Sequence, residues 1–363
     1  MAKVVVLGGA GAVGRVTAKT LVAHEAFDEV VVADIDEKTA AALAKGFGAG
    51  ATSAWIDAND RASLAAAIAG ADVVVNCTGP FYKYARTILE VVLAAGIDYV
   101  DVCDDVDATL DLLSMDDQVK AAGTRALIGM GNSPGVTNVL ARFAADQLLD
   151  EVEAVDIFHA HGGEAFEGPG VVAHRLHGMG MEIPMFLDGE LKTLGFFDPA
   201  GVAIRTKVDM YKVGKQVPVY PYPHPEQITM PSHISCRQVT NRGTVLPDAY
   251  FELTCDVAKT GMTREAPLTV GDQTVIPRDV AIAFLLERRD EILKETNFGG
   301  QRGCTMVEVR GTRRGLARTY RFQMASESEA LGEGTGIPAA LGAILMLEGK
   351  IKGPGVLPPE AAL

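Results

Sequence analysis

The first third of the chain alternates short apolar runs with alanine-rich segments in which apolar residues recur every three or four positions. Uninterrupted β-branched runs are typical of buried parallel strands, and a period near 3.6 is typical of helices. The pattern predicts a first strand that begins at Lys3, and further strands at residues 29–33, 52–56, 71–76, 98–103 and 124–130. It predicts intervening helices at residues 38–45, 61–69, 86–95 and 108–122. Repeated βα units predict a parallel, doubly wound (Rossmann) sheet with right-handed crossovers.

The pattern changes after a further helical run at residues 136–149. Alternating or short apolar segments predict strands at residues 152–161, 185–193, 250–258, 305–309 and 317–324, with one long helix at 278–294. The dipeptide Asp188-Gly189 is typical of a two-residue hairpin turn. The predicted fold class is therefore α/β, a Rossmann domain with a further α+β domain built on a mostly antiparallel sheet.

The first strand runs into the glycine spacing GxGxxG at Gly9, Gly11 and Gly14. In this motif the first glycine lets the backbone turn tightly, the second lets it approach a pyrophosphate, and the third lets the following helix pack closely. The helix N-terminus then faces the phosphates, with Ala12 and Val13 completing the cofactor-binding turn. The sequence predicts a dinucleotide site here; the alternative is a glycine-rich turn that binds no dinucleotide.

Asp34 ends the second strand at the distance where a carboxylate accepts both hydroxyls of the adenosine ribose. A 2′-phosphate at this position would meet a like charge. No arginine follows to receive that phosphate, because the next residues are Ile35 and Asp36. NAD is therefore favoured over NADP as the cofactor.

Ligands of open parallel sheets bind beyond the carboxyl ends of the strands, so the residues after each strand are further candidates. Asp57 is placed to accept a hydrogen bond from the adenine amino group, or else to cap the helix that begins near Asp60. We expect cofactor contacts from the segment that follows the fourth strand, Asn76, Cys77, Thr78, Gly79 and Pro80. Ser133 and Pro134 suit the N-cap and first position of the next helix and are also placed to contact the nicotinamide end.

Composition narrows the class of partner. The net charge of −14 in 363 residues argues against nucleic acid or an anionic membrane, so a small molecule is the expected substrate. There is no predicted signal peptide, and no apolar run is long enough to cross a membrane. The scattered cysteines indicate neither a disulfide framework nor a structural zinc site, and a reduced, cytoplasmic setting fits them: Cys77, Cys103, Cys236, Cys255 and Cys304.

If the small-molecule substrate carries an amine and a carboxylate, its oxidation by a dinucleotide would need a cation for the carboxylate and a base for the amine proton. Arg175, Arg237 and Arg242 are the candidate cations, because arginine offers a bidentate fork to a carboxylate. His174, which titrates near neutral pH, and Asp104, just past the fifth strand, are the candidate bases. For each of these residues a solvated surface position is the alternative.

Three further features lie between residues 159 and 242. The proline-rich run 220–226 could hold His224 and Glu226 rigidly at a pocket wall, or serve as a rigid linker. A metal site is conceivable among the neighbouring histidines and glutamates but is not predicted, since hydride transfer needs no metal and the spacing is not HExxH: His159, His161, His174, His177, Glu164 and Glu167. The glycine-rich segment 162–170 is either a mobile element that closes over substrate or an ordinary surface loop.

The chain resembles the saccharopine dehydrogenase family, within it the shorter lysine dehydrogenase-like branch. The resemblance rests on GGAGAVG, NCTGPF, YVDVCDD, GNSPGVTNVLA and the closing GTGIPAALGAILMLEGKI with PGVLPPE. It implies that the C-terminal helix returns to the Rossmann domain, giving a cofactor domain of residues 1–131 plus 325–363. It also implies that residues 132–324 carry substrate residues and a homodimer interface.

Members of this family oxidise a carbon that bears an amino group, or reduce the imine formed from an amine and a carbonyl compound. Two positions depart from the saccharopine-forming members: Asp34 stands where they place a basic or hydroxyl residue, and Ser133 where they carry aspartate. The resulting hypothesis is an NAD-dependent oxidoreductase acting on the CH-NH group of an amino acid or amino-acid conjugate. The alternatives are an imine reductase of polyamine or opine type, and a non-catalytic dinucleotide-binding regulator.

Overall fold

The computed structural model describes residues 2–164, 167–328 and 330–363. The chain forms two compact units: unit 1 comprises Met1–Arg142 and Leu331–Leu363, and unit 2 comprises Phe143–Ala330. The first unit therefore extends beyond residue 131, and the second continues past residue 324, compared with the predicted boundaries.

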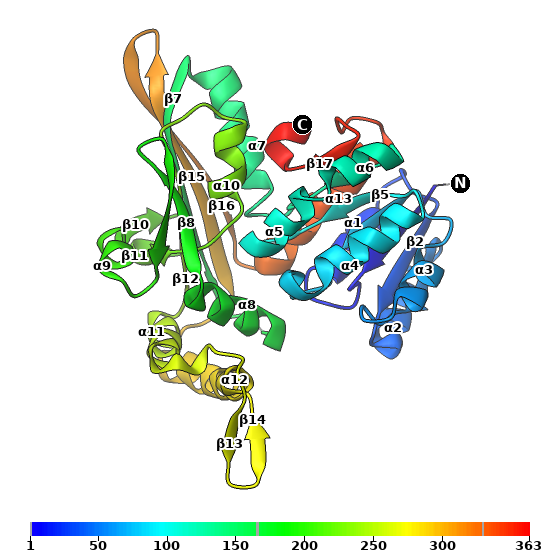
Figure 1. Ribbon diagram of the computed structural model, residues 1–363, viewed down its shortest axis with the longest axis horizontal. Helices are drawn as coiled ribbons and strands as arrows, with labels where there is room; N and C mark the ends of the chain where they lie inside the picture. The colour runs from blue at the N-terminus through cyan, green and yellow to red at the C-terminus, as the bar shows by residue number, and fades with distance from the viewer. Residues whose placement is uncertain (1, 165–166, 329) are drawn as a thin grey trace. The chain divides into compact units, whose positions relative to one another are not determined.

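Unit 1 is a seven-stranded parallel sheet in the order β17-β6-β5-β4-β1-β2-β3 (Figure 1). The six strands predicted from the apolar runs are all present, and the short C-terminal strand β17, which has no long apolar run, is an addition. The strands are β1 (Lys3–Leu7), β2 (Glu29–Asp34), β3 (Ala51–Trp55), β4 (Val73–Asn76), β5 (Asp98–Asp101), β6 (Arg125–Leu127) and β17 (Gly355–Leu357). This is the Rossmann strand order, extended by one edge strand.

Helices flank the sheet of unit 1: α1 (Gly14–Val22), α2 (Glu37–Phe47), α3 (Arg61–Ile68), α4 (Phe81–Ala94), α5 (Val106–Leu113), α6 (Asp116–Ala122), α7 (Val136–Phe143), α13 (Ala330–Leu347) and α14 (Pro359–Ala362). The single helix predicted at 108–122 is wrong, because the chain turns at Ser114 and buries Met115 between α5 and α6. The return of the C-terminal helix is confirmed. Gly336 of α13 accepts a hydrogen bond from the Thr17 hydroxyl of α1 at 3.1 Å.

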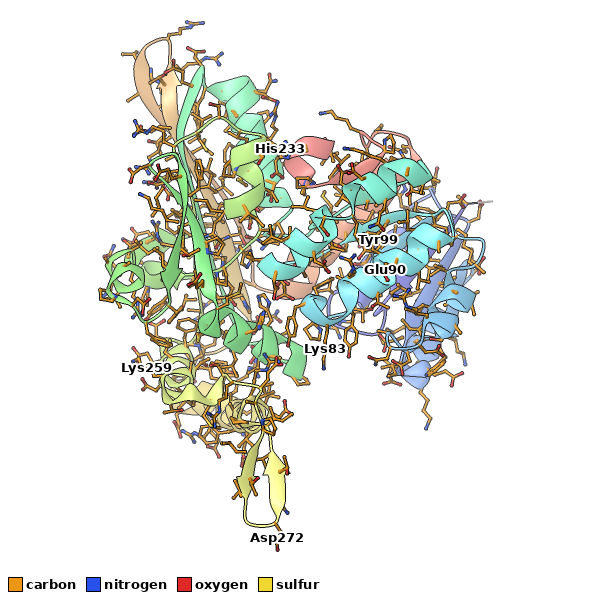
Figure 2. The ribbon with its side chains drawn as sticks, viewed as in Figure 1. Lys83, Glu90, Tyr99, His233, Lys259 and Asp272 are labelled. Carbon is orange, nitrogen blue, oxygen red and sulfur yellow. The ribbon has the colours of Figure 1, made fainter. Side chains whose placement is uncertain are left out.

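Unit 2 contains an eight-stranded sheet whose main path runs β10-β11-β12-β7-β15-β16. All its pairings are antiparallel except β7 with β12, which are parallel, so the mostly antiparallel sheet is confirmed. The strands are β7 (Glu151–Gly162), β8 (Glu182–Leu187), β9 (Glu190–Gly195), β10 (Thr206–Met210), β11 (Gly214–Pro221), β12 (Gln238–Leu246), β15 (Arg302–Arg313) and β16 (Leu316–Ser326). The strands β13 (Leu268–Val270) and β14 (Gln273–Val275) form a separate hairpin whose tip is Asp272 (Figure 2).

Several predictions for unit 2 can be compared with the structure. The Asp188-Gly189 turn joins β8 to β9 with both residues at positive φ, as a two-residue hairpin requires. The strand predicted at 250–258 is wrong, since this segment is the helix α11 (Asp248–Val257). Its buried residues, Tyr250, Phe251, Thr254 and Cys255, recur at helical rather than alternating spacing. The strands β10, β11 and β12 were missed.

The remaining helical segments of unit 2 are the π-helical turn Ala144–Leu148, α8 (Pro169–Gly180), α9 (Pro199–Ala203), α10 (Glu226–Thr229), the 3-10 turn Met230–Ser232, the π-helical turn Ala258–Met262 and α12 (Pro277–Glu295). Residues of α8, α11 and α12 share one hydrophobic core. Successive side chains of β7 point to opposite faces of the sheet, so His159 and His161 lie on one face and Phe158 and Ala160 on the other. Among the described residues, no helix combines the length and the hydropathy needed to span a membrane.

Candidate functional site

The turn between β1 and α1 is built by glycines that other residues could not replace. Gly8 has φ +71°, so the tight turn lies one residue before the predicted position at Gly9. A Cβ on Gly9 would lie 2.7 Å from the Val32 side chain, and a Cβ on Gly14 would lie 2.1 Å from the carbonyl oxygen of Gly8. These two glycines therefore serve close packing of the turn against β2 and α1.

Gly11 differs from its neighbours because it faces open space. Only the Gly8 carbonyl oxygen comes near a Cβ built there, at 3.3 Å, and both Gly11 and Ala12 are exposed. A polyanion can therefore approach the backbone at the start of α1, where backbone N–H groups favour negative charge. The turn fits the pyrophosphate of a dinucleotide.

Asp34 ends β2 beside this turn. Its Oδ2 accepts a hydrogen bond from the backbone N–H of Ala10 at 2.9 Å, and its Oδ1 accepts one from Asp36 at 3.0 Å. The two bonds fix the carboxylate at the edge of the glycine turn and leave lone pairs for ribose hydroxyls. Asp36 caps α2 by accepting from the backbone N–H of Thr39.

Asp57 follows β3, but it does not cap α3. The side chain of Asp60 accepts from the backbone N–H of Ala62 and is the N-cap. Asp57 Oδ1 accepts hydrogen bonds from the backbone and side-chain amides of Asn59, both at 2.9 Å, and these bonds lower the pKa of Asp57. Its predicted contact with adenine stays a prediction.

The segment after β4 is shaped by Asn76. This residue is fully buried; its Nδ2 donates to the Tyr99 hydroxyl at 2.9 Å, and its Oδ1 accepts from the backbone N–H of Thr78 at 2.9 Å. Thr78 Oγ1 is buried and has no hydrogen-bond partner among the described residues, while Gly79 is exposed. The Thr78 hydroxyl, which lacks a partner among the described residues, and the accessible Gly79 fit a polar ligand at this strand end. This is where a cofactor that crosses the sheet edge is expected.

Cys77 in the same segment is not reactive. Burial raises the pKa of its thiol to about 12, although a hydrogen bond with Thr17 opposes the shift. Burial likewise raises the pKa of Cys103 well above its usual range. Both thiols are neutral at physiological pH, so they behave as small apolar side chains.

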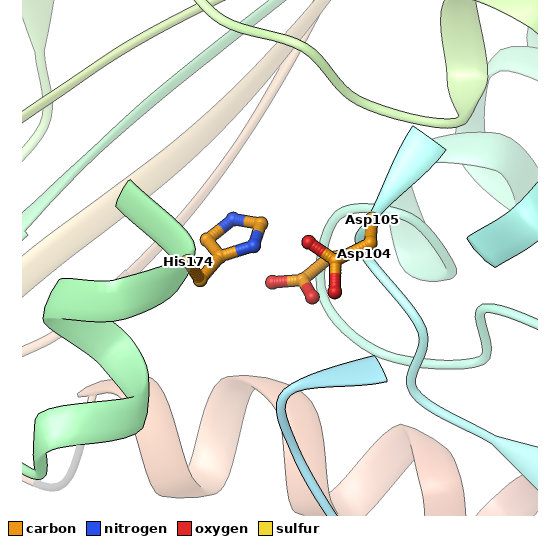
Figure 3. A group of neighbouring side chains, drawn as sticks. All are labelled: Asp104, Asp105 and His174. Carbon is orange, nitrogen blue, oxygen red and sulfur yellow. The ribbon is translucent and has the colours of Figure 1, made fainter. Parts of the chain in front are cut away.

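Two acidic residues follow β5, as Figure 3 shows. Asp105 is buried, and its Oδ2 accepts from the backbone N–H of Tyr82 at 3.1 Å, which ties the start of α5 to α4. Asp104, the candidate base, is half-buried at the carboxyl end of the sheet. This is the edge at which Rossmann sheets bind their ligands.

The loop at 129–135 leads into α7. The helix begins at Val136, so the prediction that Ser133 is its N-cap and Pro134 its first residue is wrong. Gly131 donates to the Pro134 carbonyl oxygen at 3.0 Å, and Asn138 Oδ1 accepts from the backbone N–H of Gly135 at 2.8 Å. The hydrogen bond between Gly131 and Pro134 therefore closes the loop before the helix starts. Ser133 is half-buried in this loop.

In unit 2, four rings from three segments form what we call the imidazole cluster: His159, His174, Tyr222 and His224. The ring of His159 lies 5.0 Å from that of Tyr222 and 5.2 Å from that of His224, measured between centroids. The ring centroid of His174, a residue of α8 that is labelled in Figure 3, lies 6.1 Å from that of Tyr222 and 6.4 Å from that of His224. The histidine candidates on β7, on α8 and in the proline-rich run are thus brought together.

The proline-rich run supplies part of this cluster. His224 is buried, its backbone N–H donates to Gln227 Oε1 at 2.8 Å, and its Nδ1 lies 3.3 Å from Oε2 of the buried Glu226. The run therefore buries His224 and Glu226 inside unit 2, whereas their predicted place at a pocket wall stays a prediction. Tyr222 was missed, because an aromatic residue between prolines carries no catalytic signature.

His159 is held neutral. Burial lowers its pKa well below the usual value, and the charges of His224 and His161 add to the effect. Its ring lies against Gly243 of β12, where a Cβ would be 2.0 Å from His159 Cε1. Gly243 was also missed. A single glycine within a strand can mark a place where a neighbouring group packs closely on the backbone, but the sequence does not show which group that is.

A second group, which we call the ion-pair network, lies at the start of α8: Glu164, Glu167, Arg175, Tyr250 and Arg289. Glu167 accepts hydrogen bonds from Arg175 Nη2 and from the Tyr250 hydroxyl, the latter at 2.8 Å, and Arg289 Nε lies 3.4 Å from its Oε2. Arg289 also donates to the backbone oxygen of Glu164. Tyr250 and Arg289 could not be recognised in the sequence, because they come from α11 and α12, distant in the chain.

His161 extends this network. Its Nδ1 lies 2.7 Å from Glu164 Oε1. Burial lowers the pKa of His161, but the charge and hydrogen bond of Glu164 outweigh burial and raise it above the usual value. Burial acts in the opposite sense on Glu164, whose pKa nevertheless falls to about 2 because of His161. Both shifts favour the ionised form of the pair.

The other two candidate arginines lie elsewhere in unit 2. Arg237 is exposed before β12. Arg242 Nη1 lies 3.5 Å from Asp156 Oδ1, and its guanidinium stacks over Phe158 on the opposite face of the sheet from His159. In the segment 162–170, residues 165 and 166 lie outside the described residues, whereas Glu164 and Glu167 are buried in ion pairs.

Comparison with known proteins agrees with the cofactor fold. Residues 4–127 match the saccharopine dehydrogenase NADP binding domain. This match covers about the first third of the chain and lies within unit 1. The resemblance stated from the motifs is thereby confirmed, and a nicotinamide dinucleotide is the cofactor that the domain binds.

Two relatives and one solved structure extend the comparison. A carboxyaminopropylagmatine dehydrogenase from Synechocystis sp. is 27% identical over 391 residues, which cover 99% of this chain and 92% of the relative. A carboxynorspermidine synthase from Vibrio cholerae is 26% identical over 328 residues, covering 80% and 72%. The saccharopine dehydrogenase (L-Glu forming) from Saccharomyces cerevisiae superposes with a TM-score of 0.70 at 18% identity, covering 99% of this chain and 94% of that one, and so shares the fold.

Proposed function

We propose that this protein is an NAD-dependent dehydrogenase that forms or oxidises the carbon–nitrogen bond of a carboxylated polyamine. The observation that carries the proposal is that one chain contains both a dinucleotide turn, in unit 1, and a histidine-rich cluster, in unit 2. Relatives named for carboxyaminopropylagmatine and carboxynorspermidine support the polyamine alternative over a free amino acid.

The chemistry assigns roles to residues of both units. In the oxidative direction, His174 or Asp104 accepts a proton from the substrate ammonium, which leaves a neutral amine. The adjacent carbon then loses hydride with its bonding pair, a C=N bond forms, and water hydrolyses the imine to a carbonyl compound and an amine. NAD supplies the hydride acceptor when bound. In reverse, the same acid donates its proton as the imine is reduced.

For the substrate-binding residues, we propose that His224 lies near the amine and that Arg237 meets the substrate carboxylate. His224 is held in place by Gln227 and Glu226, which suits it to a fixed contact. Arg237 is exposed, so its guanidinium is accessible for a bidentate contact.

NAD rather than NADP is proposed as the cofactor, although the matching domain is named for NADP. Asp34 places a carboxylate beside the glycine turn, where the backbone N–H of Ala10 fixes it, and the carboxylate of Asp36 caps the next helix. A 2′-phosphate there would face like charge without an arginine partner on the next two residues. The remaining predicted contacts, at Ala12, Val13, Asp57, Cys77, Pro80 and Ser133, belong to the same proposal.

The test is the reduction of NAD, followed at the nicotinamide absorbance, with carboxylated polyamines and free amino acids as substrates and NADP in parallel. We expect turnover of a carboxylated polyamine with NAD and at least tenfold lower kcat/KM with NADP. The reverse reaction is assayed with agmatine or a diamine plus an amino aldehyde that carries a carboxylate, so that reduction of the imine gives a carboxylated polyamine. Tight NAD binding without turnover in either direction would replace the enzyme with the regulatory alternative.

We also propose that the protein is a homodimer. The hairpin β13–β14 pairs with no further described strand and exposes Leu268 and Val270, and α12 exposes Val280 and Phe284 nearby in the sequence. An isolated two-stranded hairpin is marginally stable in water, and clustered exposed apolar residues are typical of interfaces. Light scattering should give twice the chain mass, and Val270→Asp should give monomers; a monomeric native protein at micromolar concentration contradicts the proposal.

A cytoplasmic location is proposed from the cysteines. All five are free thiols in the structure, which suits a reducing compartment. Fractionation of cells that express the protein tests this directly, and recovery outside the cytoplasm would exclude it.

A further inference from the structure

The helix α8, which carries His174, has little intrinsic stability. It runs from Pro169 to Gly180 and contains Gly170, Gly178 and Gly180. Each glycine in a helix interior costs about 1 kcal/mol relative to alanine. No side chain caps its first turn, since the N-cap is Gly168. The position of His174 therefore depends on tertiary contacts that hold α8 in place.

The ion-pair network provides such contacts at the start of α8. Glu167 lies immediately before the N-cap and pairs with Arg175, two turns into the helix. The same carboxylate accepts the Tyr250 hydroxyl of α11 at 2.8 Å and lies 3.4 Å from Arg289 Nε of α12. One buried carboxylate thus joins three helices, each of which contributes a donor.

Arg175 is already committed within this network. Its side chain is only 1% exposed, its Nη2 donates to Glu167, and its guanidinium lies 5.4 Å from the centre of the Tyr250 ring. Nη1 of Arg175 has no hydrogen-bond partner among the described residues, but it is buried with the rest of the side chain. A substrate carboxylate that replaced Glu167 on Nη2 would leave the buried Glu167 carboxylate without its Arg175 partner. Removing one partner of a buried ion pair costs about 3–5 kcal/mol, more than a single carboxylate contact returns.

We propose that Glu167, Arg175 and Arg289 are positioning residues, which fix α8 and so hold the ring of His174 in the imidazole cluster. Arg175 is accordingly a support for His174 and not a ligand for the substrate carboxylate. This inference rests on the proposed function only where turnover is used as the readout, because the position of His174 can also be measured directly.

The direct test uses the side-chain NMR signals of the seven histidines. In Glu167→Gln and Arg175→Lys, we expect the ring signals of His174 to shift and its measured pKa to change. His233, exposed elsewhere in unit 2, and His24 of unit 1 should keep their signals, which shows that both units are folded. Unchanged His174 signals in the two folded variants would overturn the proposal.

The kinetic test compares two neighbouring arginines of α12. Arg289→Met removes the contacts to Glu164 and Glu167, whereas Arg288→Met removes a half-exposed arginine that pairs only with Glu291 and Glu295 among the described residues. We expect kcat to fall about tenfold or more in Arg289→Met with KM within about threefold, and no change in Arg288→Met.

Arg175→Lys separates positioning from substrate binding. A positioning role predicts a lower kcat, a displaced pH profile and little change in KM. A KM raised more than tenfold with kcat unchanged would identify Arg175 as a carboxylate ligand and overturn the inference. If no amine substrate is turned over by the native protein, the proposed function fails, but the NMR test still decides whether the network positions His174.

Discussion

Asp101 offers a quantitative test of how the cofactor domain is built. It ends β5, is fully buried, and accepts hydrogen bonds at Oδ1 from the backbone N–H groups of Cys103 at 3.0 Å and Gly129 at 2.6 Å. Asp101 thereby fastens the loop that carries Asp104 to the loop that precedes Ser133. Burial raises the pKa of Asp101 to about 6, although these N–H groups oppose the shift.

The magnitude follows from linkage. A shift from 3.8 to about 6 is about two pH units, or about 3 kcal/mol at 1.36 kcal/mol per unit. Because the folded pKa is raised, the folded state binds the proton more tightly than the unfolded state. The stabilisation by the protonated form is therefore complete below about pH 4 and is lost as the pH rises through about 6.

Asp101→Asn should remove this pH dependence. Asparagine keeps an acceptor for the Cys103 and Gly129 N–H groups and carries no charge, but its amide competes with Asn76 as a donor to Tyr99, at a cost of about 1 kcal/mol. The variant should be less stable than the native protein near pH 4 and more stable by about 2 kcal/mol at pH 8.

Unfolding in urea at a series of pH values, followed by the fluorescence of Trp55, measures this difference. Trp55 is the single tryptophan and lies on β3, so it reports unit 1. Asp117→Asn, on the exposed side of α6, is the matched control and should show a difference that varies little with pH. A difference for Asp101→Asn that stays constant between pH 4 and 8 would refute the reasoning.

Three other predictions concern the site. Gly243→Ala should displace the ring of His159, because a Cβ at this position would lie 2.0 Å from that ring. We expect kcat/KM to fall about tenfold and NAD binding, measured by calorimetry, to stay unchanged. Full activity would show that the contact between Gly243 and His159 does not matter for the reaction. Asp34→Ser should narrow the ratio of kcat/KM for NAD over NADP about tenfold, and an unaltered ratio would exclude Asp34 as the selector. The raised pKa of His161 predicts that unit 2 loses stability as the pH rises through that pKa. His161→Asn should lack this loss in pH-dependent hydrogen exchange, and an identical profile would exclude the His161–Glu164 pair as its source.

The Rossmann half of the fold could be predicted from the sequence because its signals are local. Each strand is an apolar run followed by a turn, and the glycine spacing with Asp34 is set within one βα unit. The edge strand β17 escaped detection because three residues, Gly355–Leu357, are too few for a period to appear. The error at 250–258 has a related cause, since a short segment rich in apolar residues suits either a strand or a helix until its partners are known.

The candidate site in unit 2 was decided by tertiary structure. The sequence marked His174, His224 and Arg175 as chemical groups but could not assign them partners, because Tyr250 and Arg289 approach Glu167 only when α8, α11 and α12 share one core. Burial then gives the site residues different roles. It keeps His159 neutral, and it commits Arg175 to an ion pair with Glu167. Residue type and spacing thus determined the available chemistry, whereas contacts between segments distant in the chain determined which groups are charged, which are paired and which stand together.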